Sequence, residues 1–262
     1  MSNINFENLQ LSSEKRLEQL MFETDQLHKS LDKIEETEKV FEKINITLEI
    51  AGLKDLINYR LFLGIVSMDL CSAILIHSKS KSNYENIYSA RQIIVIISEA
   101  YKKIYYFIHE NKHGDIISRY RNNSYWIKEI GNIIQNELKS LQGEYSEITK
   151  DLDEYLKMNF ELLQIQRNLS IHYDKDSTKV YKMLIELDVE EIFKTLIPFI
   201  NILNKMFEFT DKLRDAYKFK SDSETEKVNH NFEKLALDLD RFKDKDSITL
   251  IEDIQTIIRQ MK

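Results

Sequence analysis

The residues that interrupt regular secondary structure are nearly absent from this chain. Its 262 residues include five glycines and one proline, Pro198. Glycine and proline supply most tight turns and mark the ends of short strands, so a fold built from many strands is excluded. Hydrophobic residues make up 42% of the chain, which is enough to form a core at this length. The sequence therefore predicts a folded, all-α protein.

A stripe of apolar residues marks the N-terminal part of the chain. Together with two polar residues in the same series, they recur at alternating steps of three and four residues. This spacing is the pattern of one face of a long helix. The stripe consists of Leu17, Leu20, Leu27, Leu31, Ile34 and Phe41, with Thr24 and Glu38 at the other seam positions. This helix could pair with a second copy of the chain or pack along its own bundle.

Hydrophobic periodicity predicts further helices along the rest of the chain. They are expected at about 46–78, 84–112 and 115–141, from about 149 through the residues near 172, at about 189–217, and as two shorter helices within 221–262 separated around 243–246. Residues 180–187 fit either a short strand or a helical turn. Asp188 and Glu191 form a capping-box pattern before the helix at 189, and Pro198 is expected to kink that helix.

Acidic residues sit where the helix near 149 is expected to begin. Asp151, Asp153 and Glu154 would lie in its first turn, where negative charge suits the helix dipole. The helices at 46–78 and 84–112 are the most apolar and are predicted to form the centre of the core. The isoleucines and phenylalanine of the second of these helices are Ile93, Ile94, Ile96, Ile97, Ile104 and Phe107.

The stretch from Leu61 to Ile76 is the most membrane-like part of the sequence. It is shorter than the roughly 20 apolar residues of a spanning helix and carries Asp69 near its centre. We therefore expect a fully buried bundle helix and no membrane. The single cysteine, Cys71, permits no internal disulfide, and residues 1–7 lack the pattern of a secretory signal. These features predict a cytoplasmic protein.

Positive charge is concentrated in one part of an acidic chain. The net charge is -7, but residues 79–128 contain nine lysines and arginines against four carboxylates, a local charge of +5. Phosphate backbones are bound largely through such cations, so this segment is a candidate RNA-binding region. Its candidate contacts are Lys102, Lys103, Arg119 and Arg121. A solvated helix face would explain the same run of charge.

One short string of residues suggests chemistry. Arg167 is followed directly by Asn168 and, after three more residues, by His172. Arginine is a permanent fork of donors for phosphate oxygens, and histidine exchanges a proton near neutral pH. On an ideal helix Asn168 and His172 lie about 40° apart, whereas Arg167 and His172 lie about 140° apart. One helix therefore does not by itself bring the guanidinium to the imidazole.

This string resembles the Arg-x4-6-His signature of the HEPN superfamily, in which a polar residue often follows the arginine. The resemblance covers about residues 46–217 and implies an antiparallel helical bundle. Residues 1–45 would then form an extra long N-terminal helix, and residues 218–262 a C-terminal helical extension. HEPN nucleases generally act as homodimers in which two motifs face each other across a groove, so the resemblance implies a composite site.

The resemblance also implies a reaction that needs neither a metal nor another cofactor. The ribose 2′-hydroxyl of RNA would be the nucleophile, His172 the general acid or base, and Arg167 the group that stabilises the transition state. Asn168 would orient the phosphate or the imidazole. The products would be a 2′,3′-cyclic phosphate and a 5′-hydroxyl end. The expected setting is toxin–antitoxin or phage defence, with an antitoxin protein as a possible partner.

Four further residues are candidates for supporting roles. Asp69 and Glu99 are carboxylates within otherwise apolar helices, so each should have a partner, lie in a cleft or sit at a boundary. Either could pair with Arg167 or Arg91. Tyr173 and Asp174 follow the histidine. Asp174 takes a place, two positions after His172, that carries tyrosine or aspartate in some HEPN groups.

A second motif suggests a different chemistry. His109, Glu110 and His113 match the His-Glu-x-x-His pattern of zinc proteases. Gly114 follows at once as a probable C-cap, and the extended pattern fails at Ile116 and Arg119. We therefore predict no metal site.

The sequence leaves three functions open. The first is a metal-independent endoribonuclease of HEPN type. The second is a non-catalytic HEPN-like module that binds RNA, a nucleotide or a protein partner. The third is an interaction protein that is organised by the N-terminal stripe.

Overall fold

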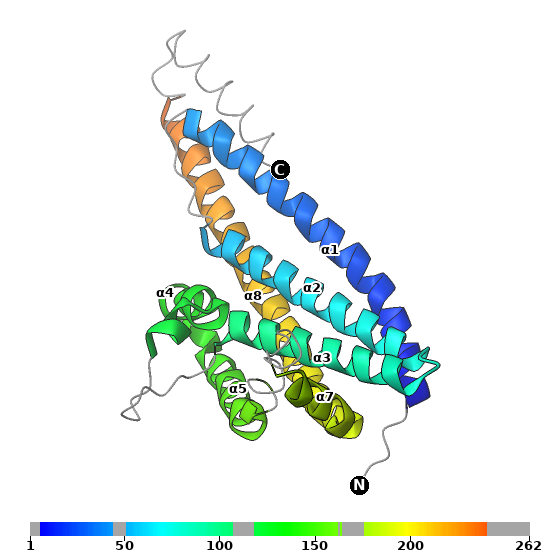
Figure 1. The fold of residues 1–262 in the computed structure, drawn as a ribbon. Helices are drawn as coiled ribbons and strands as arrows, with labels where there is room; N and C mark the ends of the chain where they lie inside the picture. The colour runs from blue at the N-terminus through cyan, green and yellow to red at the C-terminus, as the bar shows by residue number, and fades with distance from the viewer. Residues whose placement is uncertain (1–5, 44–50, 107–117, 162, 164–175, 240–262) are drawn as a thin grey trace. The chain divides into compact units, whose positions relative to one another are not determined.

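The computed structural model describes residues 6–43, 51–106, 118–161, 163 and 176–239 (Figure 1). Nearly all of these residues are helical, and none of them lies in a strand. The prediction of an all-α helical bundle is therefore confirmed. The chain divides into two compact units, residues 1–211 and 212–262, and each is considered by itself.

Three long helices run back and forth in the first unit (Figure 1). They are α1 (Phe6–Lys43), α2 (Ala51–Ser78) and α3 (Asn83–Ile104). Helix α1 packs along α2, and α2 packs against α3. This arrangement accounts for the apolar stripe of α1 over its described side chains, because α1 packs along a helix of the same chain. The side chain of Phe41 lies outside the described residues.

The contact between α1 and α2 is close at one point. Leu20 of the stripe is 1% exposed, and Thr24, one turn later, lies over Gly64 of α2. A Cβ at position 64 would lie 2.7 Å from Thr24 Oγ1, so any side chain there would force a shift in this contact. Near the other end of the pair, Lys54 Nζ donates to Glu38 Oε2 at 2.8 Å. The polar seam positions of the stripe are thus used within the bundle.

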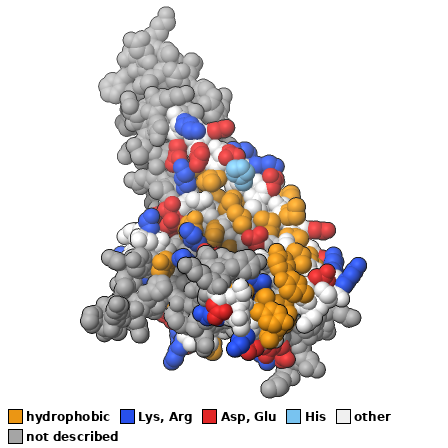
Figure 2. All heavy atoms as spheres, in the orientation of Figure 1, with side chains coloured by type: hydrophobic (Ala, Val, Ile, Leu, Met, Phe, Trp, Pro, Cys, Tyr) orange, Lys and Arg blue, Asp and Glu red, His pale blue; other side chains and the backbone are white. Residues whose placement is uncertain are grey.

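Helix α2 is less buried than its sequence predicts. It is the only helix within the described residues that is long and apolar enough to cross a membrane, by length and composition alone, and core helices of soluble proteins pass the same test. Only 39% of its most apolar window is buried, so the prediction of a fully buried helix is wrong. Figure 2 shows hydrophobic side chains gathered over α2 and α3 on one face. The large exposed hydrophobic residues of these two helices are Ile65, Ile76, Tyr84 and Tyr88.

Helix α3 begins at a reciprocal cap and supplies the centre of the core. The Glu85 N–H donates to Ser82 Oγ, while Glu85 Oε2 accepts from the Ser82 N–H at 3.0 Å. Ile93, Ile94, Ile97 and Ile104 are fully buried, as predicted, whereas Ile96 is only half-buried. The helix ends at Ile104, eight residues before the predicted end at 112, and Phe107 lies outside the described residues.

The predicted single helix at 115–141 is wrong over its described part. Instead, a 3-10 helix η1 (Ser118–Asn123), a π-helix η2 (Tyr125–Ile130), the short α4 (Gly131–Asn136) and a 3-10 helix η3 (Lys139–Leu141) follow one another. Ser124 leaves the helical region of backbone angles, at φ -77° and ψ 153°. The buried Trp126 then stacks on Tyr145, at 4.9 Å between ring centroids, and donates from Nε1 to Thr149 Oγ1 at 2.9 Å.

Three more helices complete the described chain. They are α5 (Gln142–Glu161), α7 (Ser177–Glu186) and α8 (Val189–Leu239). Helix α5 begins seven residues earlier than predicted, so the acidic residues at 151–154 do not form its first turn. The ambiguous residues 180–187 belong largely to α7. Helix α8 continues to Leu239, past the end predicted near 217, and Pro198 lies inside it.

Local caps and side-chain bonds fix α8 within the first unit. Asp188 Oδ1 accepts from the N–H groups of Glu190 and Glu191, which confirms Asp188 as the cap of this helix. The Thr195 hydroxyl donates to Asn159 Oδ1 of α5 at 3.0 Å. Arg60 of α2 pairs with Asp211 at 2.9 Å. Helices α2 and α5 are thereby tied to α8.

Candidate nucleic-acid interface

The residues of the Arg-Asn-x3-His string lie outside the described residues. So do the other two candidates that follow it and the His-Glu-x-x-His string; these residues are Arg167, Asn168, His172, Tyr173, Asp174, His109, Glu110 and His113. The structure does describe the chain on either side of the first string. The described residues nearest to this string are Leu163 and Asp176.

Leu163, which precedes the string, is hydrogen-bonded to α3. Leu163 is fully buried, and its carbonyl oxygen accepts a hydrogen bond from Ser98 Oγ at 2.8 Å. Arg167 follows Leu163 by four residues. On the other side, Asp176 caps α7, because its Oδ1 accepts from the Thr178 N–H at 3.0 Å. Leu163 is thus bound to α3, and Asp176 is fixed at the start of α7.

The two candidate acidic residues occupy different environments. Asp69 is exposed on α2, although partial burial among apolar neighbours raises the pKa of its carboxyl. It therefore sits at a boundary of the core, one of the alternatives that the sequence left open. Glu99 is half-buried on α3 and follows Ser98 directly. Of the two, Glu99 is the one beside the bond to Leu163.

Lys102 and Lys103 open onto a cavity of about 410 Å³ at the end of α3. We call it the lysine–tyrosine pocket. Among the described residues, it is lined by Lys102, Lys103, Tyr106, Asn123, Tyr125 and Glu129. Helix α3 supplies the lysines, and η1 and η2 supply Asn123, Tyr125 and Glu129. Lys103 is exposed and Lys102 is half-buried. Cations at a helix C-terminus also suit the helix dipole, so the lysines have a structural role as well.

Tyr106 holds an unusual backbone conformation at the mouth of this pocket. Its φ is 68°, the only positive φ of a non-glycine residue in the described chain. Its N–H donates to the Tyr101 carbonyl at 3.1 Å, which closes the end of α3. A side chain in this left-handed region costs about 1–2 kcal/mol, and such strain clusters at functional sites.

Tyr125 is held from behind by aromatic rings of α2. Its ring stacks on Phe62, with 5.1 Å between centroids and 27° between planes, and it tilts against the fully buried Tyr59 at 5.9 Å. Because Tyr125 is half-buried, part of its ring remains open to the pocket. Rings held in this way form stacking platforms for unpaired bases.

Glu129 gives the pocket a titratable group of opposite sign. Burial raises the pKa of its carboxyl, the nearby Asp55 raises it further, and Lys128 opposes both effects. Within the described residues, its buried Oε2 has no hydrogen-bond partner. The pocket therefore carries two positive charges when Glu129 is protonated and one net positive charge when it is ionised.

Arg121 occupies a structural position rather than an open one. Its guanidinium lies 3.9 Å from the centroid of the Tyr105 ring, and its Nη1 pairs with Asp153 Oδ1 at 3.1 Å. The side chain is 17% exposed. The Tyr105 hydroxyl donates to the same Asp153 oxygen at 3.0 Å. Arg121 thus joins η1 to α3 and α5. The side chain of Arg119 lies outside the described residues, although its backbone belongs to η1.

The pocket contains four residues that the sequence did not single out. Tyr106, Asn123, Tyr125 and Glu129 come together only because η2 packs against the end of α3. The local signal was the placing of Tyr106 close to the two lysines, since aromatic residues interleaved with cations are typical of nucleic-acid surfaces. Comparison with known proteins identifies no match among family models, curated proteins or solved structures.

Proposed function

We propose that this chain is a HEPN-like, metal-independent endoribonuclease that acts as a homodimer in the cytoplasm, in a toxin–antitoxin or phage-defence setting. The observation that carries the proposal is the hydrogen bond from Ser98 to Leu163. It joins Leu163, four residues before Arg167, to α3, the helix whose last turn carries Lys102 and Lys103. The proposal places the RNA-binding lysines on the helix that anchors the residue preceding the motif.

The spacing along α3 supports this assignment. Ser98 and Lys102 are four residues apart, so they lie on the same side of the helix and about 6 Å apart along its axis. Arg167 is four residues from the Leu163 carbonyl that Ser98 binds. In the proposal, one strand of RNA contacts the lysines and the motif through successive phosphates.

In this proposal the lysine–tyrosine pocket binds single-stranded RNA. Lys102 and Lys103 neutralise phosphates, and Tyr106 and Tyr125 stack on unpaired bases. The sugar–phosphate chain then passes to the motif. Unpaired RNA is the favoured substrate because bases in a duplex are not available for stacking.

The motif residues would carry the reaction itself. His172 transfers the proton of the 2′-hydroxyl or of the leaving group, Arg167 neutralises the charge that builds on the phosphoryl oxygens, and Asn168 orients the phosphate or the imidazole. A second copy of the motif from the partner subunit would complete the site, since Arg167 and His172 would lie about 140° apart on an ideal helix. No metal ion enters this scheme.

The test is RNA cleavage in the presence of EDTA. The wild-type protein should produce fragments with 2′,3′-cyclic phosphate and 5′-hydroxyl ends, and His172→Ala should abolish cleavage. His28→Ala is the matched control, because His28 is an exposed residue of α1 in the described structure. Equal cleavage by wild type and His172→Ala, or none by wild type across a range of RNAs, would remove the catalytic claim.

A second candidate is a non-catalytic module that binds RNA without cleaving it. The lysine–tyrosine pocket favours it, because the described residues of the pocket already supply two cations and two aromatic rings. The test is binding of a fluorescent single-stranded RNA. This candidate is supported over the nuclease if binding is lost in Lys102→Glu/Lys103→Glu, is retained in His172→Ala and is not accompanied by cleavage.

A further inference from the structure

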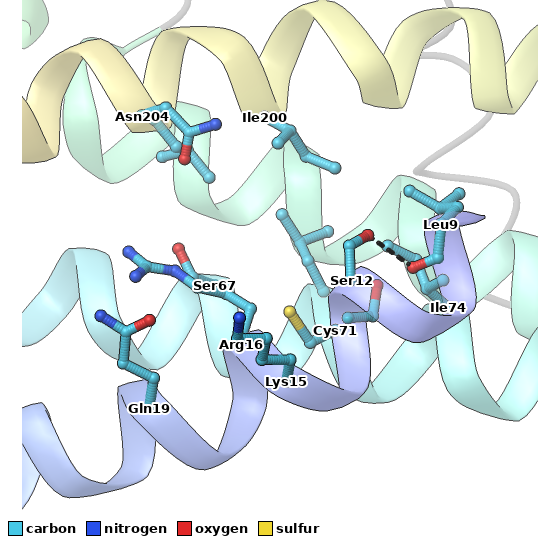
Figure 3. Close-up of a pocket in the computed structure, with 13 residues that line it drawn as sticks. Leu9, Ser12, Lys15, Arg16, Gln19, Ser67, Cys71, Ile74, Ile200 and Asn204 are labelled. Carbon is cyan, nitrogen blue, oxygen red and sulfur yellow. Dashed lines mark hydrogen bonds between the residues drawn. The ribbon is translucent and has the colours of Figure 1, made fainter.

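A second cavity lies in the first unit, between α1, α2 and α8, and is separate from the lysine–tyrosine pocket (Figure 3). Its volume is about 350 Å³, within the range of small-molecule sites. We call it the Arg16 pocket. Its lining residues include Leu9, Arg16, Cys71, Ile74, Ile200 and Asn204.

The pocket has an apolar end and a polar end. In Figure 3, Leu9 and Ile74 lie at one end with Ser12, whose hydroxyl is already used in a hydrogen bond to the Leu9 carbonyl, while Asn204 and Gln19 lie at the other end, toward which the guanidinium of Arg16 extends. Ile200 contributes to the apolar wall from α8. A ligand that fills this space would need an apolar body and a polar head.

Two cations, Lys15 and Arg16, line the pocket and favour an anionic head, and the guanidinium of Arg16 is the one that extends toward the polar end. That guanidinium lies 5.2 Å from the centroid of the Phe207 ring, and no carboxylate of the described residues forms an ion pair with it. Arg60 lies over the same ring at 5.4 Å, but its charge is paired with Asp211. Of the two arginines on this ring, Arg16 is therefore the one whose charge an anion can still neutralise. A carboxylate matches its planar fork of donors.

The volume sets the length of the apolar body. A cavity of about 350 Å³ corresponds to roughly a dozen water volumes of about 30 Å³ each. An unbranched acid with about eight carbons has a similar number of non-hydrogen atoms. The geometry points to a binding site for a medium-chain aliphatic monocarboxylate, with its carboxylate on Arg16 and its chain between Ile74 and Ile200.

Such a ligand would tie three helices together. Arg16 belongs to α1, Ile74 to α2 and Ile200 to α8, so an occupied pocket bridges the outer helix α1 to the core. Because the ligand binds only where these helices are assembled, it stabilises the folded protein in proportion to its concentration. The site stands independently of the RNA-cleaving function.

The single cysteine gives a direct report on occupancy. Cys71 is buried, it lines the pocket, and no other cysteine occurs in the chain. Alkylation of its thiol by a small maleimide requires the reagent to enter the pocket. A bound acid should therefore slow the alkylation.

The experiment titrates the full-length protein with octanoate and measures binding by calorimetry, thermal stability and the rate of Cys71 alkylation. A ligand of about ten non-hydrogen atoms is expected to bind with a Kd of about 0.1–1 mM. Octanol, which lacks the charge, and acetate, which lacks the chain, should each bind at least about tenfold more weakly, because each loses one of the two interactions.

Two variants separate the site from general effects. Arg16→Gln should weaken octanoate binding by about tenfold or more, whereas Lys39→Gln, the same charge change at an exposed position of α1, should leave it unchanged. Ile200→Trp, which fills the pocket with a larger side chain, should abolish both binding and protection of Cys71 if Arg16→Gln fails to fold. The assignment would be overturned if octanol protected Cys71 as well as octanoate does. It would also be overturned if octanoate bound unchanged to Arg16→Gln or to folded Ile200→Trp, or if octanoate did not bind at several times the expected Kd.

Discussion

Helices α1 and α2 approach closely at Gly64. Whether Gly64→Ala stabilises or destabilises the protein should therefore depend on one atom, Thr24 Oγ1. Gly64→Ala adds a Cβ that would lie 2.7 Å from Thr24 Oγ1 and 3.9 Å from Thr24 Cβ. The first distance requires a shift, and the second is an ordinary contact. Removal of that oxygen by Thr24→Ala should therefore convert an unfavourable substitution into a favourable one.

The magnitudes follow from two opposing effects. Overpacking of this kind costs about 1–3 kcal/mol, while alanine is favoured over glycine inside a helix by about 0.8–1.0 kcal/mol. Gly64→Ala should thus lower the free energy of unfolding by up to about 2 kcal/mol in the wild-type background. In the Thr24→Ala background the same change should raise it by up to about 1 kcal/mol. The coupling free energy between the two positions is then about 1–3 kcal/mol.

The assay is urea denaturation of the four proteins of this double-mutant cycle. The single tryptophan, Trp126, is buried in the first unit and reports its unfolding by fluorescence. Gly143→Ala is the control in both backgrounds, because nothing lies within 4 Å of a Cβ at that position. The same change in stability for Gly64→Ala with and without the Thr24 hydroxyl would refute the close approach of α1 to α2.

Three further predictions concern the interface. Lys102→Glu/Lys103→Glu should weaken binding of single-stranded RNA, measured by fluorescence anisotropy. The slope of log affinity against log salt concentration should fall in magnitude by about 1.4, as expected for two lost phosphate contacts. An unchanged slope would show that the RNA binds elsewhere. The pKa of Glu129 is higher in the folded protein than its ordinary 4.5, so the folded state binds the proton more tightly than the unfolded state does. Both the free energy of unfolding and the affinity for RNA should therefore fall as pH rises from about 4.5 through the raised pKa. Glu129→Gln should flatten both profiles in pH-dependent melts and binding assays, and a variant that keeps the wild-type profiles would contradict this. Ser98→Ala should cost about 1–3 kcal/mol of stability in denaturation experiments, because the buried Leu163 carbonyl loses its donor; no measurable loss would show that this bond does not anchor Leu163.

The helices with strong local signals were predictable from the sequence. Helix α3 starts at the Ser82 and Glu85 box, and Asp188 marks the start of α8, because caps depend on residues three or four apart. The break at Ser124 was not predictable. It depends on Trp126, whose ring packs on Tyr145 nineteen residues later and fixes a π-helix where periodicity alone predicts a continuous helix.

The candidate interface was predictable only in part for a similar reason. The local charge pointed to Lys102 and Lys103, which do line a pocket. The same count of charge gave Arg121 equal weight, but Arg121 lies against Tyr105 and pairs with Asp153, more than thirty residues away in the sequence. Charge runs identify candidate cations. They do not tell which cation a distant carboxylate will neutralise.

The backbone at Tyr106 has a consequence for how this protein can be altered. A glycine there would relieve about 1–2 kcal/mol of backbone strain and lose about 0.5–1 kcal/mol through the added freedom of the unfolded chain. A stability screen would therefore accept Tyr106→Gly as harmless or mildly beneficial. The same change would remove an aromatic wall of the lysine–tyrosine pocket. Selection for stability would therefore favour glycine at position 106, whereas selection for an intact pocket would favour tyrosine.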